Sequence, residues 1–293
     1  MATDMQPSAT LEPPPRDGRI GTRIGELSLF ARVAQGALAT VYRASDSRAE
    51  FAVKIYDRSA ADSVRAELES AAQRRIQHRS VARLVGSGCL ADGSPYVVSD
   101  WIDGAPLTSM IANRPSWPAV RRVIRSIGVG LDAMHTAGVV HRDLKPSNVM
   151  VPATGTPAAV ILDFSHALIV GNSRVTQTGV VLGSSAYMSP EQASGLPLDG
   201  RSDLYALGVI CYELLTGVPP FADASAAELL RKHQCEPVIP PRRRAPDRGI
   251  PQAAEDLCMW LLVKNRDARV PSARVLSVTL GAMTDETGKG GFE

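Results

Sequence analysis

An eight-residue stretch near the middle of the chain carries a carboxylate, an ammonium and an amide at short spacing. It runs from His141 to Asn148 and reads HRDLKPSN. Asp143 can accept a proton, Lys145 can meet a phosphate, and the amide oxygen of Asn148 can hold a divalent metal. Moving a phosphoryl group from a nucleotide to a hydroxyl requires these groups together. The stretch therefore predicts phosphoryl-transfer chemistry.

The same stretch resembles the catalytic loop of protein kinases, and a second motif follows at a matching distance. Asp163-Phe164-Ser165 begins twenty residues after Asp143 and resembles D-F-G, whose aspartate holds magnesium between the nucleotide phosphates. The resemblance implies that Asn148 and Asp163 are the metal ligands. Serine replaces the glycine of the motif, and glycine tolerates backbone angles that serine resists.

Short β-type runs precede these motifs, at residues 29–34, 40–44 and 51–56. The first turn resembles the glycine-rich phosphate loop of the family, of which only Gly36 remains, with Ala39 where another glycine is usual. Phe51-Ala52-Val53-Lys54 resembles the V-A-I-K strand. Burying a lysine in an apolar strand is costly unless an anion meets it. We therefore expect Lys54 to hold the α- and β-phosphates.

Residues 62–77 predict a helix that offers two partners for Lys54. Glu67 and Glu69 point about 200° apart on a helix, so only one can face the lysine. Kinases place the paired glutamate nine residues before a histidine, and His78 selects Glu69. The four-apart apolar residues and candidate caps of this helix are Val64, Leu68, Ala72 and Ile76, with Asp62 or Ser63.

Residues 96–104 resemble the hinge between the two kinase lobes. In that register the Asp100 carbonyl and the Ile102 amide meet the adenine edge, and Ser99 takes the gatekeeper position, where bulky residues are usual. A small gatekeeper predicts an enlarged pocket behind the adenine. The residues expected to bind ATP are Ala34, Gly36, Val41, Ala52, Lys54, Ser99, Asp100, Ile102 and Met150.

Residues 166–189 are polar and correspond to the activation segment. They resemble most closely the bacterial transmembrane-type serine/threonine kinases, in which two threonines autophosphorylate. The resemblance implies that Thr176 and Thr178 are regulatory phosphosites and that a phosphate there pairs with Arg142. A basic residue is frequent in the family where Leu168 stands.

Other residues are expected to be structural. Ser189-Pro190-Glu191 resembles A-P-E, which implies an ion pair between Glu191 and Arg269. Asp203 is expected to hold the catalytic-loop backbone. The expected large-lobe helices are 116–137, 202–215, 224–233, 252–263 and 272–282. A basic patch at 242–244 in a proline-rich loop either docks acidic substrates or is simply solvated.

Composition sets limits on the class of protein. The 293 residues have a net charge of +2, which does not favour nucleic acid or an anionic membrane as partner. The scattered cysteines form no C-x-x-C pair, so neither a zinc site nor a disulfide framework is expected. We find no signal peptide and no apolar run of about 18 residues, the length of a membrane span. We therefore expect a cytoplasmic protein without a membrane span.

Together the motifs imply an α+β, bilobal protein-kinase-like fold, with a β-rich N-lobe carrying one helix and a mostly helical C-lobe. We expect a disordered proline-rich tail at 1–23, the domain at 24–282 (N-lobe about 24–100, C-lobe about 103–282) and a disordered tail at 283–293. The implied family is the bacterial Hanks-type serine/threonine kinases.

The implied activity is phosphoryl transfer from ATP, with Mg²⁺ or Mn²⁺, to protein serine and threonine hydroxyls. Dimerisation for autophosphorylation in trans is an additional expectation. Two alternatives stay open. Ala34, Ala39 and Ser165 would suit a nucleotide-binding pseudokinase that acts as a regulatory scaffold. A small-molecule phosphotransferase of similar fold is the other, although Lys145-Pro146 and the segment ending at Glu191 are typical of protein-substrate kinases.

Overall fold

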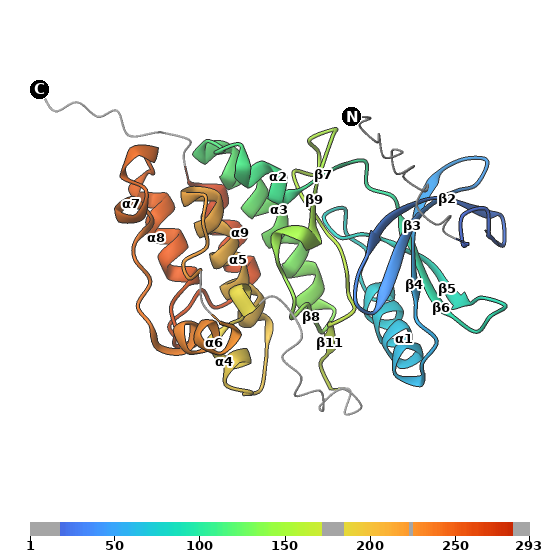
Figure 1. Cartoon of the computed structure of the whole chain (residues 1–293). Helices are drawn as coiled ribbons and strands as arrows, with labels where there is room; N and C mark the ends of the chain where they lie inside the picture. The colour runs from blue at the N-terminus through green and yellow to red at the C-terminus, as the bar shows by residue number, and fades with distance from the viewer. Residues whose placement is uncertain (1–17, 172–184, 223–224, 284–293) are drawn as a thin grey trace, which may run out of the picture.

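The small lobe consists of a six-stranded antiparallel sheet and one helix (Figure 1). The computed structural model describes residues 18–171, 185–222 and 225–283. The strands, in the order β1-β2-β3-β4-β6-β5, are β1 (Arg23–Ile24), β2 (Leu27–Gln35), β3 (Ala39–Ser45), β4 (Glu50–Tyr56), β6 (Pro95–Asp100) and β5 (Leu84–Cys89). Five were expected, and the two-residue β1 is too short to show a periodic pattern.

The folded region begins before residue 24, the first residue that sequence reasoning assigned to the domain. The Gly21 amide donates to the Leu29 carbonyl at 2.8 Å, and Arg23 lies opposite Ser28 in the sheet. These contacts tie the first described residues to β2.

Helix α1 (Ala60–Arg74) packs against the sheet through contacts with β5 and β6. It begins earlier than predicted, because Ser59 is the N-cap and its hydroxyl accepts from the Asp62 amide at 3.0 Å. Asp62 therefore lies in the first turn, where its charge suits the helix dipole. The predicted apolar stripe is wrong at Val64, which is 52% exposed, whereas Glu69 is buried on the inward face.

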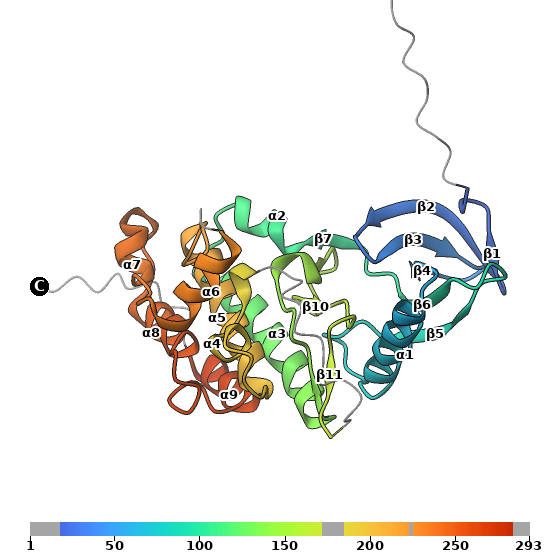
Figure 2. The ribbon, with the colours of Figure 1, turned by 60° about the horizontal axis from the view of Figure 1, so that its bottom comes forward.

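The large lobe is mostly helical (Figure 2), and its central helix α5 contacts α3, α8 and α9. Helix α5 (Gly200–Thr216) is buried along most of its length and ends at Gly217, whose φ of 88° suits glycine. The remaining helices are α2 (Leu107–Ala112), α3 (Trp117–Thr136), α4 (Pro190–Ala193), α6 (Ala226–Cys235), α7 (Pro241–Arg244), α8 (Gln252–Leu261) and α9 (Ala273–Ala282). One hydrophobic cluster joins α3, α5, α8 and α9, and the small lobe holds two smaller clusters.

Residues 242–244 form most of the short helix α7, not the loop that we expected. Pro241 occupies its first turn, where the missing N–H of proline costs nothing. The Arg242 amide donates to Glu255 at 2.7 Å, and its guanidinium bonds Gln252. Part of the basic patch is therefore bound by the chain itself.

Two small sheets lie where the lobes meet and carry the motifs. One has the order β10-β9-β7, with β10 (Val160–Ile161), β9 (Val149–Pro152) and β7 (Gly104–Pro106). The other pairs β11 (Leu168–Ile169) with β8 (Val139–Val140). Because β8 leads into HRDLKPSN and β11 follows Asp163, this pairing brings the two motifs together. Within the described ranges, no helix combines the length and the hydropathy that crossing a membrane demands.

Candidate active site

One buried carboxylate accepts hydrogen bonds from the backbone of the catalytic loop. Asp203, on α5, is 1% exposed and accepts from the amides of His141 and Arg142, both at 2.9 Å. His135 on α3 adds a contact of 2.8 Å. Burial opposes the charge, but these partners hold the pKa of Asp203 below its ordinary value. The same contacts support the left-handed backbone of Arg142, whose φ is 69°.

The side chains of Asp143, Lys145 and Asn148 contact one another in this loop. Lys145 Nζ lies 2.7 Å from Asp143 Oδ2. The Asn148 amide nitrogen donates to the Asp143 carbonyl at 2.9 Å and to its Oδ2 at 3.2 Å. Because the nitrogen of Asn148 makes these bonds, its amide oxygen is left to bind a metal. The short helix at Pro146–Asn148 produces this arrangement by turning the chain back toward Asp143.

Lys54 is shared between two carboxylates that come from different lobes. Its ammonium lies 3.2 Å from Glu69 Oε2 and 2.5 Å from Asp163 Oδ1. Of the two candidate glutamates on α1, the structure brings Glu69 to the lysine, and Glu67 is exposed. Lys54 therefore connects the sheet, α1 and the segment that follows β10.

Lys54 lies closer to Asp163 than to Glu69, and the pKa values of the two carboxyl groups differ accordingly. Burial raises the pKa of Glu69 to about 7, and Lys54 offsets this only in part. Burial would also raise the pKa of Asp163, but the closer Lys54 ammonium and Ser165 hold it well below its ordinary range. Asp163 is thus ionised near neutral pH, as a metal ligand must be.

The phenol of Tyr56 also contacts Lys54 and Glu69, and sequence reasoning missed it. Tyr56 is 1% exposed, and its hydroxyl donates to Glu69 Oε2. Its ring centroid lies 5.3 Å from Lys54 Nζ. Tyr56 follows Lys54 by two residues and therefore lies on the same side of the strand, which was the available signal.

Serine at the third position of the Asp163 motif is accommodated without strain here. The left-handed residue is Asp163, with a φ of 57°, and not Ser165. The Ser165 amide donates to Asp163 Oδ1 at 3.2 Å. Phe164 is 1% exposed and packs 5.7 Å from the His141 ring. The motif is therefore anchored by its phenylalanine, with the Asp163 carboxylate directed to Lys54.

The residues expected around the adenine lie on neighbouring strands. Ala52 stands opposite Ser99, and Val41 stands opposite Lys54. Met150 pairs with Pro106 across β9 and β7. The amide of Ile102 donates to no residue in the described part of the chain, so it is available to an adenine nitrogen. Ala34 and Gly36 are exposed at the tip of the β2–β3 turn.

The expected structural ion pair is formed and fully enclosed. Arg269 and Glu191 are 2% and 4% exposed, and two of their atom pairs lie at 2.9 and 3.1 Å. The Ser202 hydroxyl donates to Glu191 at 2.8 Å. Arg269 and Ser202 lower the pKa of Glu191 despite burial. The pair fixes α4, which follows the activation segment, to the large lobe.

Thr176 and Thr178 lie outside the described residues. Leu168, which stands where a basic residue is frequent, is a β11 residue opposite Val140. The guanidinium of Arg142 makes no ion pair with any other residue that the structure describes.

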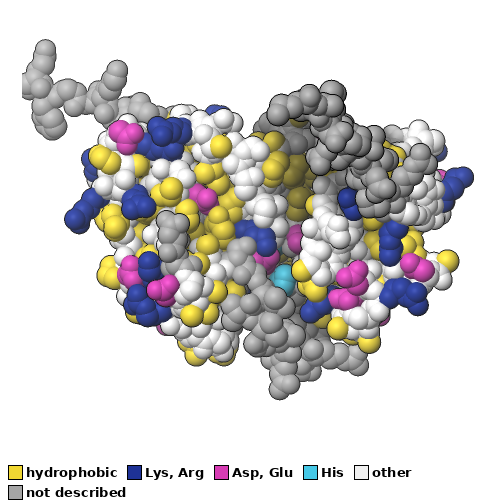
Figure 3. All heavy atoms as spheres, viewed as in Figure 1, with side chains coloured by type: hydrophobic (Ala, Val, Ile, Leu, Met, Phe, Trp, Pro, Cys, Tyr) yellow, Lys and Arg dark blue, Asp and Glu magenta, His cyan; other side chains and the backbone are white. Residues whose placement is uncertain are grey.

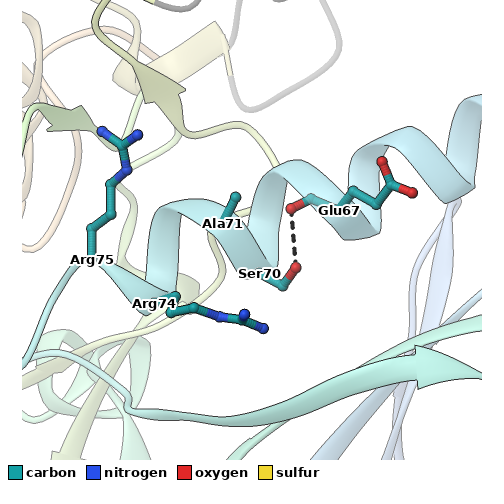
Figure 4. A pocket seen from close by; sticks show the side chains of 5 residues that line it. All are labelled: Glu67, Ser70, Ala71, Arg74 and Arg75. Atoms are coloured by element: carbon teal, nitrogen blue, oxygen red, sulfur yellow. Dashed lines mark hydrogen bonds between the residues drawn. The ribbon is translucent and has the colours of Figure 1, made fainter.

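Charged and histidine side chains gather at the junction of the lobes in Figure 3, where the surface is hollowed. A separate hollow lies on α1 and is lined by Glu67, Ser70, Ala71, Arg74 and Arg75 (Figure 4). There the Ser70 hydroxyl donates to the Glu67 carbonyl at 3.0 Å. Because Glu67 points away from Glu69 on the helix, this second hollow is not part of the Lys54 site.

Comparison with known proteins agrees with this geometry. The family model described as "Protein kinase domain" matches residues 28–279. The serine/threonine-protein kinase pkn3 of Myxococcus xanthus is 39% identical over 232 residues, which cover 76% of this chain and 42% of that protein. The serine/threonine-protein kinase PknL of Mycobacterium tuberculosis is 36% identical over 265 residues, covering 87% of this chain and 65% of that protein.

A third relative, the serine/threonine-protein kinase PknB of Mycobacterium leprae, is 34% identical over 222 residues, covering 74% of this chain and 35% of that protein. The chain thus spans between about a third and two thirds of the length of these relatives. The two-lobed fold and the bacterial serine/threonine kinase resemblance expected from the motifs are both confirmed. The chain belongs to the protein kinase family.

Proposed function

We propose that this chain transfers the γ-phosphoryl group of ATP to serine and threonine hydroxyls of proteins. The observation that carries the proposal is the convergence of Lys54, Glu69, Asp163, Asp143 and Asn148 at the junction of the lobes. Every group that phosphoryl transfer needs for binding, charge neutralisation and proton acceptance is present there. The presence of all five groups argues against a nucleotide-binding pseudokinase.

Each side chain has a proposed role in the reaction. Lys54, oriented by Glu69, binds the α- and β-phosphates. Asp143 orients the acceptor hydroxyl and takes its proton, while Lys145 neutralises charge on the γ-phosphate. The transition state is loose, so the protein contributes mainly by positioning and by stabilising charge. Because Lys145 already contacts Asp143 at 2.7 Å, one ammonium can serve both the carboxylate and the phosphate.

The donor set fits a hard divalent cation. Asp163 supplies an ionised carboxylate and Asn148 an amide oxygen, and oxygen ligands of this kind suit Mg²⁺ and Mn²⁺. When bound, the cation neutralises phosphate charge. Protein-kinase family membership supports ATP with a divalent metal in general, and we propose Mg²⁺ as the metal used.

The adenine subsite is proposed to involve Asp100, Ile102, Ala52, Val41 and Met150, with Ala34 and Gly36 over the phosphates and Ser99 behind the ring. We further propose that the protein acts in the cytoplasm on protein substrates, that it requires no nucleic acid, and that two copies meet for autophosphorylation. The names of the similar proteins, all serine/threonine-protein kinases, support protein substrates.

The proposal is tested by incubating the purified chain with γ-labelled ATP, Mg²⁺ and a generic protein substrate, beside Asp143→Asn. We expect labelled phosphoserine and phosphothreonine, and at least about a hundredfold less with the variant. Nucleotide binding by both proteins without labelled substrate would favour the pseudokinase. Labelling of tyrosine alone would refute the proposed acceptor specificity.

Regulation by phosphorylation forms a separate part of the proposal. Arg142 lies beside Asp143 and has no described ion-pair partner, so a phosphate on Thr176 or Thr178 would supply one. The double variant Thr176→Ala/Thr178→Ala should lose most activity. Activity equal to that of the parent would show that these threonines do not control the enzyme.

A further inference from the structure

His166 and Ser165, which directly follow the Asp163-Phe164 pair, form a contact that reaches the catalytic carboxylate. The Ser165 hydroxyl lies 3.1 Å from His166 Nδ1. The same Nδ1 lies 3.7 Å from Asp143 Oδ2, just beyond hydrogen-bond distance. The departure from glycine at 165 therefore places a hydroxyl where it holds a histidine beside Asp143.

Asp143 Oδ2 already has two neighbours, the Lys145 ammonium at 2.7 Å and the Asn148 amide nitrogen at 3.2 Å. His166 is the third group around this oxygen, and its side chain is 37% exposed, so it can exchange a proton with water. The Asp143 side chain is 13% exposed. A charge change on His166 therefore acts on a carboxylate that solvent screens only in part.

Four charged groups face His166 from the elements around it. Asp143 and Asp163 favour the imidazolium, whereas Lys145 and Lys54 oppose it. Burial is the largest effect, and the pKa of His166 is below its ordinary value of 6.5. The ring is thus neutral near pH 7 and acquires its charge on acidification.

We propose that His166 is a positioning residue for Asp143, whose imidazolium form pairs with Asp143 Oδ2 and withdraws that oxygen from the acceptor hydroxyl. The proton comes from water, and its release returns a neutral ring that leaves the carboxylate free. In the neutral form, Nδ1 accepts from the Ser165 hydroxyl; in the charged form, Nδ1–H donates toward Asp143. This inference rests on the proposed role of Asp143.

The kinetic test compares kcat of the parent and His166→Gln at saturating nucleotide and metal, from about pH 5.5 to about pH 8.5. Titrations of the nucleotide itself are common to both proteins and cancel in the comparison. We expect the ratio of kcat at the upper to the lower limit to be at least about threefold smaller in His166→Gln. Equal ratios in the two proteins would overturn the proposal.

Two further variants sharpen the comparison. His166→Arg carries a permanent charge and is expected to show a depressed kcat at both limits, with a flattened ratio. His78→Gln removes another partly buried histidine of lowered pKa, and it is expected to keep the parental ratio. A parental ratio in His166→Arg, or a flattened ratio in His78→Gln, would count against a specific effect at Asp143.

A titration that needs no activity decides the same question. The chain has five histidines, so NMR can follow the His166 ring proton, assigned by its loss in His166→Gln. In Asp143→Asn we expect the pKa of His166 to fall by at least about 0.5 unit, because the favourable carboxylate is gone. Asp132→Asn is the control and should lower the pKa of His78 but not of His166. An unchanged pKa of His166 in Asp143→Asn refutes the pairing, whereas absence of phosphoryl transfer in the parent would refute only the proposed function.

Discussion

Tyr56 donates a hydrogen bond from its buried phenol to Glu69, the same carboxylate that pairs with Lys54. Strand β4 therefore binds helix α1 through two side chains, one cationic and one neutral. Glu69 is 4% exposed, so neither partner can be replaced by water without rearrangement. The position of α1, and with it the orientation of Lys54, depends on both contacts.

Removing only the phenol oxygen of Tyr56 should weaken catalysis while leaving the packing intact. In Tyr56→Phe, Glu69 loses a charge-assisted hydrogen bond, and we expect kcat/KM for ATP to fall by about tenfold. The measurement is steady-state kinetics with ATP varied. Tyr96→Phe, on the neighbouring strand β6, is the matched control, because Tyr96 packs over Gly88 rather than against Glu69. Equal effects of the two changes would show that the Tyr56 hydroxyl has no special role.

The raised pKa of Glu69 makes a prediction about stability and pH. The folded value is about 7 and the ordinary value is 4.5, so between these pH values the folded chain binds more protons than the unfolded chain. Ionisation of Glu69 therefore costs stability as pH rises through this window. We expect the unfolding free energy of the parent, relative to Glu69→Gln, to fall by up to about 3 kcal/mol across it. Denaturant titrations at several pH values measure this difference, and a flat or rising difference would contradict the assignment.

Ser99 should control access to the space behind the adenine. It stands opposite Ala52 on one side and Leu84 on the other, so the three side chains lie on one face of the sheet, where serine occupies less space than a bulky residue would. Ser99→Met should weaken bulky-substituted ATP-site inhibitors by about tenfold or more. Isothermal titration would measure their affinities, with Ser99→Ala as the control that keeps the space open. Unchanged affinity in Ser99→Met would show that no such space is used.

Breaking the Glu191–Arg269 pair should destabilise the large lobe strongly. Glu191→Ala leaves a buried guanidinium without its carboxylate, at a cost of about 3–5 kcal/mol. Glu236→Ala provides the comparison, since its pair with Arg231 is exposed on both sides and should be worth at most about 1 kcal/mol. Chemical denaturation would measure both. Similar losses in the two variants would mean that burial does not determine the strength of these pairs.

Residues that belong to a short motif could be assigned to the candidate site from the sequence. Lys54 and Asp163 were each assigned to the nucleotide site from their own motifs, and the structure brings them to within 2.5 Å of each other. Their direct contact was not predicted. Helical geometry predicted that only one of Glu67 and Glu69 could face Lys54. The resemblance to kinases, through the position of His78, then selected Glu69.

Contacts between unrelated segments could not be predicted in this way. Tyr56 resembles any buried aromatic residue in a strand, and only the packing of α1 shows that its hydroxyl meets Glu69. His166 lies beside Asp143 because β11 pairs with β8, two strands too short to have a periodic signature. The cap of α1 at Ser59 was missed because Asp62 and Ser63 have equally good capping chemistry, and the tertiary position of the helix selects among them.

The most direct test of the central claim is the intact mass of the purified chain after incubation with ATP and Mg²⁺, beside Asp143→Asn treated identically. Our account predicts added phosphate on the parent and none on the variant, with both proteins binding nucleotide. Phosphate on neither protein, with nucleotide binding retained, would contradict the claim that Asp143, Lys54 and Asp163 form a working phosphoryl-transfer site.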